Sequence, residues 1–128
     1  MNNNINGIGK EYDDDNNLSF ESEYLNGKRK GKGKEFYDNV VIFDGIYLNR
    51  ERNRKGKEFY DDGKLKFDGI YLNGKRNGKG KEFYDDGKLK FDGEYLNDLK
   101  CKGKGYNNQG NVIYKLKNSK QFTKEIDW

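Results

Sequence analysis

The chain lacks histidine and is poor in cysteine and in long apolar runs, and each shortage excludes a class of protein. Without histidine it has neither the commonest general base nor the serine and cysteine triads that depend on it. A single cysteine, Cys101, cannot form an intrachain disulfide and fits a reducing compartment. No apolar run is long enough to span a bilayer, and the first residues show no secretion signal. We therefore expect a cytoplasmic protein.

The composition argues against a thick hydrophobic core. Only 31% of the 128 residues are apolar, whereas 38% are charged. This balance would suit a disordered chain, but 15% aromatic content and regularly spaced glycines favour a thin, ordered structure. The 26 lysines and arginines are nearly matched by 22 acidic residues, so the surface is mixed and predicts no specific nucleic-acid partner.

The chain repeats itself with a short period. Aligned glycines recur at Gly9, Gly33, Gly56, Gly80 and Gly105, with spacings of 24, 23, 24 and 25 residues. Periods in this range indicate a repeat architecture. We predict a repeat array of four to five copies over residues 7–118, an N-terminal tail over 1–6, and a C-terminal cap or tail over 119–128.

Each copy contains two extended runs and two turns. KLKFDGIYL (64–72) and GKGKEFYD (78–85) alternate their side chains as strands do, and no stretch shows helical periodicity. Between these runs we expect a turn over residues 73–78. Asp86-Gly87 predicts a second turn, of the two-residue type I′ kind that needs positive φ.

Pairing Asp85 with Lys88 across that second turn predicts the strand register. One face then pairs Tyr84 with Leu89, Glu82 with Phe91, and Gly80 with Gly93. The opposite face pairs Phe83 with Lys90, Lys81 with Asp92, and Lys79 with Glu94. The first face is aromatic with a glycine spine, and the second pairs opposite charges in most positions. Many such pairs, at roughly 0.2–1 kcal/mol each, would stabilise the array in place of one core.

Glycines inside the strands, such as Gly69 and Gly93, leave slots on the sheet surface. An aromatic ring can lie in such a slot and shield the bare backbone. We expect Tyr47, Tyr71 and Tyr95 to cover glycines of this kind.

The pattern aromatic-x-Gly-x-aromatic-x-x-Gly-x-x-x-Gly-x-Gly resembles the MORN (membrane occupation and recognition nexus) repeat. It recurs with the correct period from Gly7 to about Asn118. The resemblance implies an all-β fold of tandem antiparallel β-hairpins that form one elongated, twisted, single-layer sheet. The structural glycine and aromatic positions that carry the motif are Phe43, Gly45, Tyr47, Phe67, Gly69, Tyr71, Gly74, Gly78, Gly80, Phe91, Gly93 and Tyr95.

Some copies depart from the motif. Ser22 replaces a strand glycine, Arg50 and Arg54 replace turn glycines, and Asp98 with a one-residue insertion alters the fourth copy. Bacterial antitoxin-like proteins carry a similar variant with a YxxNG turn, which EFYDDGKL resembles.

Clusters that suggest chemistry have simpler explanations. Asp13-Asp14-Asp15 and the aspartate pairs at 61–62 and 85–86 precede turns, and they lack EF-hand spacing. The run from Gly74 to Gly80 has the wrong spacing for a phosphate loop and is expected to be a hairpin turn. Cys101, in a degenerate turn without a partner base, is incidental. We expect no catalytic residue, no metal and no cofactor.

Glutamates recur on the aromatic face at Glu11, Glu35, Glu58 and Glu82. They could form a binding stripe. The favoured interpretation is that each accepts a hydrogen bond from a tyrosine hydroxyl or stays hydrated at the edge of a thin sheet.

Basic residues gather at alternate turns. Since alternate turns fall on one long edge of the sheet, we expect one basic edge and an acidic edge opposite. The anion-binding or partner-binding candidates are Lys28, Arg29, Lys30, Lys32, Lys75, Arg76 and Lys79. A purely solvating role for these charges is the alternative.

The leading functional interpretation is a non-enzymatic repeat scaffold whose aromatic face binds a protein partner or a second copy, because a thin sheet would leave apolar area exposed. One alternative is peripheral membrane or phosphoinositide binding through the basic edge. Another is an antitoxin-like inhibitor.

Overall fold

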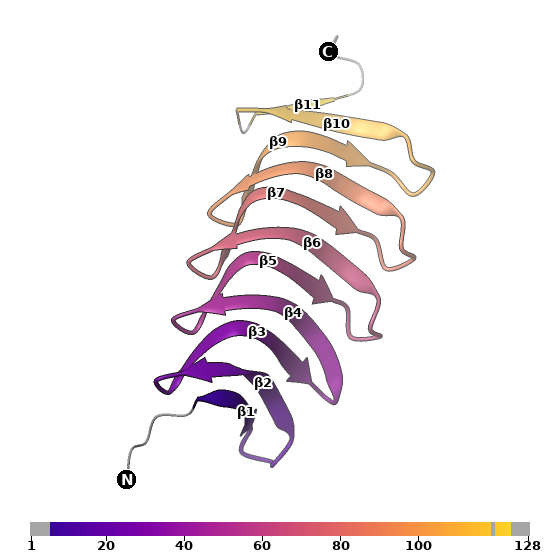
Figure 1. The fold of residues 1–128 in the computed structure, drawn as a ribbon. Helices are drawn as coiled ribbons and strands as arrows, with labels where there is room; N and C mark the ends of the chain where they lie inside the picture. Colours follow the sequence, from indigo (N-terminus) through magenta and orange to yellow (C-terminus); the bar gives the residue numbers. More distant parts are fainter. Residues whose placement is uncertain (1–5, 119, 124–128) are drawn as a thin grey trace.

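A computed structural model of the chain describes residues 6–118 and 120–123. They form one eleven-stranded antiparallel sheet in which every strand pairs with its neighbours in the sequence, in the order β1 to β11. Figure 1 shows the strands stacked as successive bent hairpins along one long axis. The sheet is a single layer, and no helix occurs in the described residues. The predicted all-β array of tandem hairpins is therefore confirmed.

The strands are mostly eight to ten residues long in the middle of the array and shorter near its ends. Their bounds are β1 Gly7–Tyr12, β2 Leu18–Leu25, β3 Lys28–Tyr37, β4 Val40–Leu48, β5 Glu51–Phe59, β6 Leu65–Leu72, β7 Lys75–Phe83, β8 Leu89–Leu96, β9 Leu99–Tyr106, β10 Val112–Lys117 and β11 Lys120–Thr123. The sheet thus continues past residue 118 into β11. The rest of the expected N-terminal tail and C-terminal cap, residues 1–5 and 124–128, lies outside the described residues, and the predicted domain limits stay a prediction.

Two-residue turns close one long edge of the sheet. Both central residues have positive φ in Asn49-Arg50 (50° and 73°) and in Asn73-Gly74 (51° and 82°), as type I′ turns require. The expected turn over 73–78 is therefore wrong beyond Gly74, because β7 begins at Lys75. Arg76 is a strand residue and not a turn residue.

The turn after β7 also differs from its prediction. Only Gly87 has positive φ there, and Asp85, Asp86 and Gly87 together form a three-residue loop. The Gly87 N–H donates to the Tyr84 carbonyl (2.9 Å), and the Tyr84 N–H donates to the Lys88 carbonyl (2.8 Å). A type I turn followed by a left-handed glycine gives this pattern, so the predicted type I′ turn at Asp86-Gly87 is wrong.

The predicted register is correct in the middle of the hairpin and wrong next to the turn. Lys79 opposes Glu94, Gly80 opposes Gly93, Lys81 opposes Asp92, and Glu82 opposes Phe91. A bulge between Glu82 and Phe83 then shifts the pairing, so that Phe83 opposes Leu89 instead of Lys90. The extra loop residue is the cause, since a third loop residue must be absorbed by the flanking strands.

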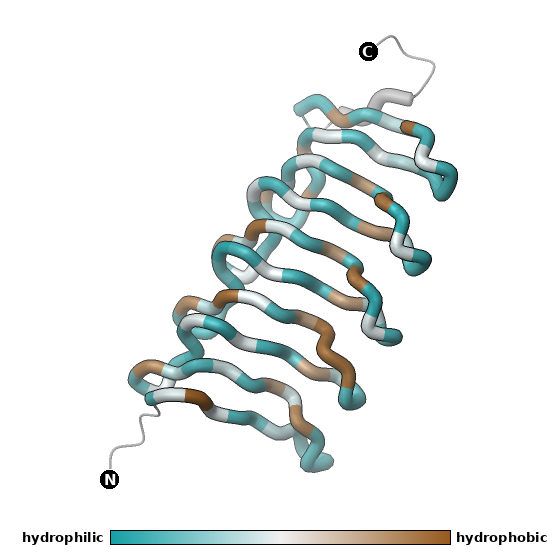
Figure 2. Tube along the Cα trace, turned by 45° about the vertical axis from the view of Figure 1, so that its right-hand side comes forward, coloured by the Kyte–Doolittle hydropathy of each residue, from teal (hydrophilic) through white to brown (hydrophobic). Residues whose placement is uncertain are grey.

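The core is a row of aromatic rings on one face of the sheet. Phe43, Phe67 and Phe91 are fully buried, and Tyr47 and Tyr71 are each 2% exposed. Phe43 and Phe67 each meet the tyrosine of their own copy and that of the next copy edge to face: the Phe67 ring centroid lies 5.7 Å from that of Tyr71 and 5.2 Å from that of Tyr95. Figure 2 shows the matching hydrophobic segments recurring along the stack between hydrophilic turns. One layer can bury these rings because they pack directly against glycines.

Candidate functional site: the two faces of the sheet

Glycines form the floor under the aromatic rings. The rings of Tyr47, Tyr71 and Tyr95, which were expected to cover glycines, lie over Gly33, Gly56 and Gly80: a Cβ at these three positions would come within about 3 Å of a tyrosine ring. The phenylalanines cover the inner strand glycines in the same way. A Cβ at Gly69 would lie 2.5 Å from the Phe67 ring and 2.8 Å from the Gly80 Cα on the neighbouring strand. Such a contact needs a very small residue, which is glycine at 45, 69 and 93 and serine at Ser22, opposite Gly33.

A cluster of glutamate, arginine and tyrosine lies over each ring pair. In the third copy, Glu58 accepts two hydrogen bonds from the Arg76 guanidinium, at 3.0 and 3.1 Å, and one from the Tyr71 hydroxyl. The Arg76 guanidinium carbon lies 4.0 Å from the centre of the Phe67 ring. The cluster is therefore a bidentate ion pair that closes over the core.

The same cluster occurs in the other copies with small changes. Arg29 and Arg52 bind Glu11 and Glu35 in the same bidentate way. In the fourth copy Lys100 takes the arginine position, with its Nζ 3.5 Å from Glu82 and 4.8 Å from the Phe91 ring centre. Because a lysine cannot bind a carboxylate through two parallel N–H groups, this last cluster is held less specifically.

The clusters shift the pKa values of their members. Burial would raise the pKa of Glu58, but the hydrogen bonds from Arg76 and Tyr71 outweigh it, and the net pKa is lowered. The same balance lowers the pKa of Glu35. Burial and the bond to Glu11 raise the pKa of Tyr24 to about 12. The lowered pKa values favour the ionised carboxylates of Glu35 and Glu58, which bind the arginine and tyrosine of their clusters.

This geometry corrects the expectation that the aromatic face exposes a binding patch. The rings are covered by one another and by the ion-pair clusters, and the Arg76 and Glu58 side chains are themselves only 16% and 17% exposed. The glutamates accept tyrosine hydrogen bonds, which was one of the two interpretations left open for them. The other, a free acidic binding stripe, does not fit these contacts.

The basic residues separate into two groups. The side chains of Arg29 and Arg76 lie on the aromatic face, where each forms an ion pair with a glutamate. The expectation that they lie on a basic turn edge is therefore wrong. Lys28, Lys30, Lys32, Lys75 and Lys79 are exposed. Sequence reasoning missed the clusters and the roles of Arg52 and Lys100. The sequence does contain a signal for these clusters. Arg76 is separated from Gly80 and Glu82 by even numbers of residues, as side chains on one face of a strand are, and basic residues recur at 29, 52, 76 and 100.

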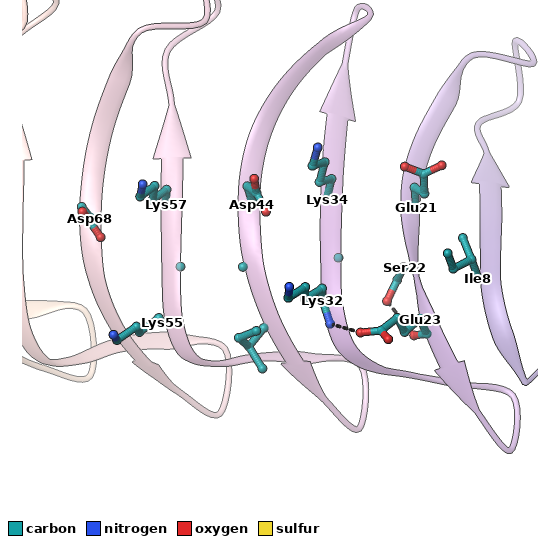
Figure 3. A pocket seen from close by; sticks show the side chains of 14 residues that line it. Ile8, Glu21, Ser22, Glu23, Lys32, Lys34, Asp44, Lys55, Lys57 and Asp68 are labelled. Carbon is teal, nitrogen blue, oxygen red and sulfur yellow. Dashed lines mark hydrogen bonds between the residues drawn. The ribbon is translucent and has the colours of Figure 1, made fainter.

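The opposite face, which we call the charged face, carries a ladder of alternating charges. Along the sheet Glu21 opposes Lys34, Lys34 opposes Asp44, and the alternation continues through Lys57, Asp68, Lys81, Asp92 and Lys104. Figure 3 shows this row crossing strands β2 to β6. A groove of about 750 Å³ follows it, with Ile8, Ile46 and glycines among the lining residues.

Exposed leucines line one margin of the charged face. Leu25, Leu48, Leu72 and Leu96, which we call the leucine row, are each the last residue before a two-residue turn and are 44%, 43%, 49% and 58% exposed. On the same face, two positions earlier in their strands, lie Ile46 and Ile70. The described residues therefore present an apolar margin beside a charged groove.

The acidic turns and the cysteine have structural roles. The Asp13 carboxylate accepts hydrogen bonds from the N–H groups of Asp15 and Asn17, and Asp62 and Asp86 accept one each from Lys64 and Lys88. Within residues 6–118 and 120–123 no group of three metal-ligating side chains comes together. Cys101 is half-buried in β9 beside the Glu94 carbonyl and is not in a turn, contrary to expectation. The described residues also contain no helix able to cross a membrane.

Comparison with known proteins identifies the repeats. A family described as "MORN repeat variant" matches residues 5–26, 55–73 and 76–97, and the family "MORN repeat" matches residues 20–39. No curated protein matches this chain. A solved structure of an S. aureus TarM mutant in complex with Fondaparinux, alpha-GlcNAc-glycerol and UDP is 15% identical, with a TM-score of 0.38, and the match covers 91% of this chain but 19% of that one. At this TM-score the likeness has no bearing on fold or function.

The two family matches together span more than half of the 128 residues. MORN repeats are generally non-enzymatic modules associated with protein and membrane interaction. The matched copies coincide with the hairpins that carry the glycine floors and the ion-pair clusters. The chain therefore carries MORN repeats over the matched residues.

Proposed function

We propose that this chain is a non-enzymatic scaffold that binds a protein partner through the charged face. The observation that carries the proposal is the leucine row. Four leucines are at least 43% exposed at equivalent positions of successive copies, and the strands of the first three, β2, β4 and β6, also line a groove of alternating charge. Aligned exposed apolar side chains rimmed by charges are typical of protein contact sites.

The aromatic face supports this choice of surface by elimination. Its rings pack against one another and its charged groups are paired, so this face offers a partner little exposed apolar surface and few unpaired polar groups. On the charged face, Lys32 and Lys55 stand opposite the apolar Ile46 and Ile70, and both lysines are exposed. A partner with an acidic and apolar surface matches this margin.

Affinity capture from the native source tests the proposal. The bait is the full chain, and its matched variant is Leu48→Lys with Leu72→Lys, which removes two central members of the leucine row. We expect capture of a partner by the wild type and at least a roughly tenfold loss with the variant, because apolar anchors near the centre of an interface carry most of its affinity.

The control bait is Ile113→Lys, which alters an exposed apolar residue outside the row (42% exposed). It should capture as the wild type does. Equal capture by all three baits, with unchanged melting temperatures, would place the contact elsewhere.

A second candidate is peripheral membrane binding, favoured by the pairing of lysine with leucine at the turn margin. Lys28 opposes Leu25, and Lys75 opposes Leu72, with all four side chains exposed. Basic residues near an anionic leaflet contribute about 1 kcal/mol each, and adjacent leucines can enter the interface.

Sedimentation with vesicles tests this candidate, comparing phosphatidylcholine alone, added phosphatidylserine, and added phosphoinositide. Binding to either anionic set that Lys28→Glu with Lys75→Glu abolishes supports it, and recovery of all protein in the supernatant contradicts it. The antitoxin-like role stays a prediction, to be tested by co-purification with a toxin.

A further inference from the structure

The first strand has the sequence of an interior strand but lies at the edge of the sheet. β1 pairs only with β2 in the described part of the chain. Its Gly9-Lys10-Glu11 matches Gly56-Lys57-Glu58 of β5 and Gly80-Lys81-Glu82 of β7. Both of those strands are paired along both edges. The outer edge of β1 therefore offers backbone N–H and C=O groups to a further strand.

Gly56 and Gly80, at equivalent positions of two interior strands, are covered by rings from both sides. A Cβ at Gly56 would lie 2.4 Å from the Phe43 ring of the preceding strand and 2.9 Å from the Tyr71 ring of the following strand. Gly80 lies in the same way between Phe67 and Tyr95. The three atoms nearest to the Cβ position of Gly9 all belong to the Tyr24 ring, the closest at 2.7 Å. In the described residues no strand precedes β1 in the sheet, so no ring corresponding to Phe43 or Phe67 covers Gly9.

Tyr24 lacks the corresponding ring partner. Tyr47, Tyr71 and Tyr95 each meet a phenylalanine of the preceding hairpin edge to face, at centroid distances of 4.9, 5.3 and 5.2 Å. In residues 6–118 no ring packs on Tyr24 in this way. Tyr24 is 9% exposed against 2–3% for the other three, and the Glu11 side chain beside it is 42% exposed against 17% for Glu58.

We propose that β1 is a docking edge for an antiparallel strand of a partner polypeptide that carries the sequence aromatic-acid-glycine. One such strand would supply three missing contacts: backbone hydrogen bonds for the outer edge of β1, a second ring over Gly9, and a ring partner for Tyr24. Its aromatic ring would lie over Gly9 against Tyr24, its acid would oppose Lys10, and its glycine would oppose Gly9. This site is separate from the charged face and does not depend on the function proposed for that face.

The interior of the array supplies the register. Phe43 opposes Glu58, Asp44 opposes Lys57, and Gly45 opposes Gly56. Phe67, Asp68 and Gly69 repeat these pairs with Glu82, Lys81 and Gly80. Glycine fits best there because the Gly69 Cβ position lies 2.8 Å from the Gly80 Cα, and only a residue as small as Ser22, which faces Gly33 in β2, replaces it in this array.

The probe for the test is a peptide of residues 65–72, LKFDGIYL, acetylated and amidated at its ends and added to the full chain. We expect saturable binding by calorimetry, with slowed hydrogen exchange confined to β1. Absence of saturable binding, or slowed exchange that spreads equally over other strands, overturns the proposal. Loss of the proposed charged-face contact would leave this result unchanged.

Two further arms test the chemistry. The peptide with Phe67→Ala should bind about tenfold more weakly, since an aromatic pair and its burial contribute on this order. The protein variant Lys10→Glu should weaken binding of the original peptide and restore it with the peptide carrying Asp68→Lys. Lys10 is 53% exposed and also pairs with Glu21 at 3.8 Å, so restored binding with the Asp68→Lys peptide separates a lost contact from a loss of fold. Equal affinity in all four combinations would contradict the assigned register.

Discussion

At the scale of single residues, the ion-pair clusters show how a thin sheet protects its rings. Each arginine serves twice, because its guanidinium binds a carboxylate and also covers a phenylalanine: the Arg52 carbon lies 4.0 Å from the Phe43 ring centre. Each glutamate also accepts a tyrosine hydroxyl. Polar atoms thus act as the second layer that the composition could not supply from aliphatic residues.

We predict that Glu58→Gln lowers the free energy of unfolding by about 2 kcal/mol, because a hydrogen-bonded, largely buried charge pair loses one charge. Urea unfolding followed by circular dichroism measures the change. The matched control is Glu11→Gln, whose carboxylate is 42% exposed at the end of the array. Its loss should be well under half as large, and equal losses would contradict the role assigned to burial.

The backbone at Arg54 has a strained conformation that glycine would adopt without strain. Its φ is 64°, and Gly31 and Gly78 take positive φ at the equivalent positions of the neighbouring copies (89° and 111°). A left-handed conformation costs a non-glycine residue roughly 1–2 kcal/mol. We predict that Arg54→Gly stabilises the protein by about 1 kcal/mol, measured as a rise in the urea midpoint. The reverse change, Gly78→Ala, should destabilise it, and opposite signs in either variant would refute the strain.

At the scale of the strands, facing glycines set how closely neighbours approach. Gly45 faces Gly56, and Gly69 faces Gly80. The rings of Phe43 and Phe67 lie across these pairs. Each of these strand pairs is therefore specified by two facing glycines that a phenylalanine ring covers. The opposite charges on the other face fit the same register.

We predict that Gly69→Ala costs about 2–3 kcal/mol in unfolding free energy, because its Cβ would press on the Gly80 backbone as well as on the Phe67 ring. Thermal or urea unfolding reports the loss. Gly87→Asn serves as the control, since nothing lies within 4 Å of a Cβ there and asparagine tolerates positive φ. The idea fails if both variants lose the same stability.

At the scale of the whole molecule, the clusters couple stability to pH at both ends of the range. The pKa values of Glu35 and Glu58 are lowered on folding, so their contribution is present above the ordinary carboxyl pKa of 4.5 and is lost as the pH falls below it. The pKa of Tyr24 is raised from 10.0 to about 12, so its contribution is present below pH 10 and is lost as the pH rises toward 12.

We therefore predict a plateau of stability between these limits, with losses on the acid and alkaline sides, measured as urea midpoints from about pH 3 to pH 12. Tyr24→Phe should reduce the alkaline loss, because it removes one of the raised groups. Tyr12→Phe, at a 58% exposed position, should leave the profile unchanged. An alkaline loss that Tyr24→Phe does not alter would contradict the contribution assigned to Tyr24.

Much of the architecture could be predicted from the sequence. The period of 23 to 25 residues, the alternation within KLKFDGIYL and the Asn-Gly turn signal predict stacked hairpins, because these are local properties of strands and turns. The pairing of Gly80 with Gly93 followed from counting across one turn. The bulge at Phe83 did not, because the sequence Asp-Asp-Gly suits both a two-residue and a three-residue loop.

The sequence by itself determined the repeat, the all-β class and the division into an aromatic and a charged face, since alternation and spacing are encoded locally. Only the tertiary structure decided which face is free. Arg76 pairs with Glu58, 18 residues earlier and two strands away, and that contact exists only once the hairpins have stacked. It closes the aromatic face over its rings, whereas the leucine row and the lysines of the charged face stay exposed.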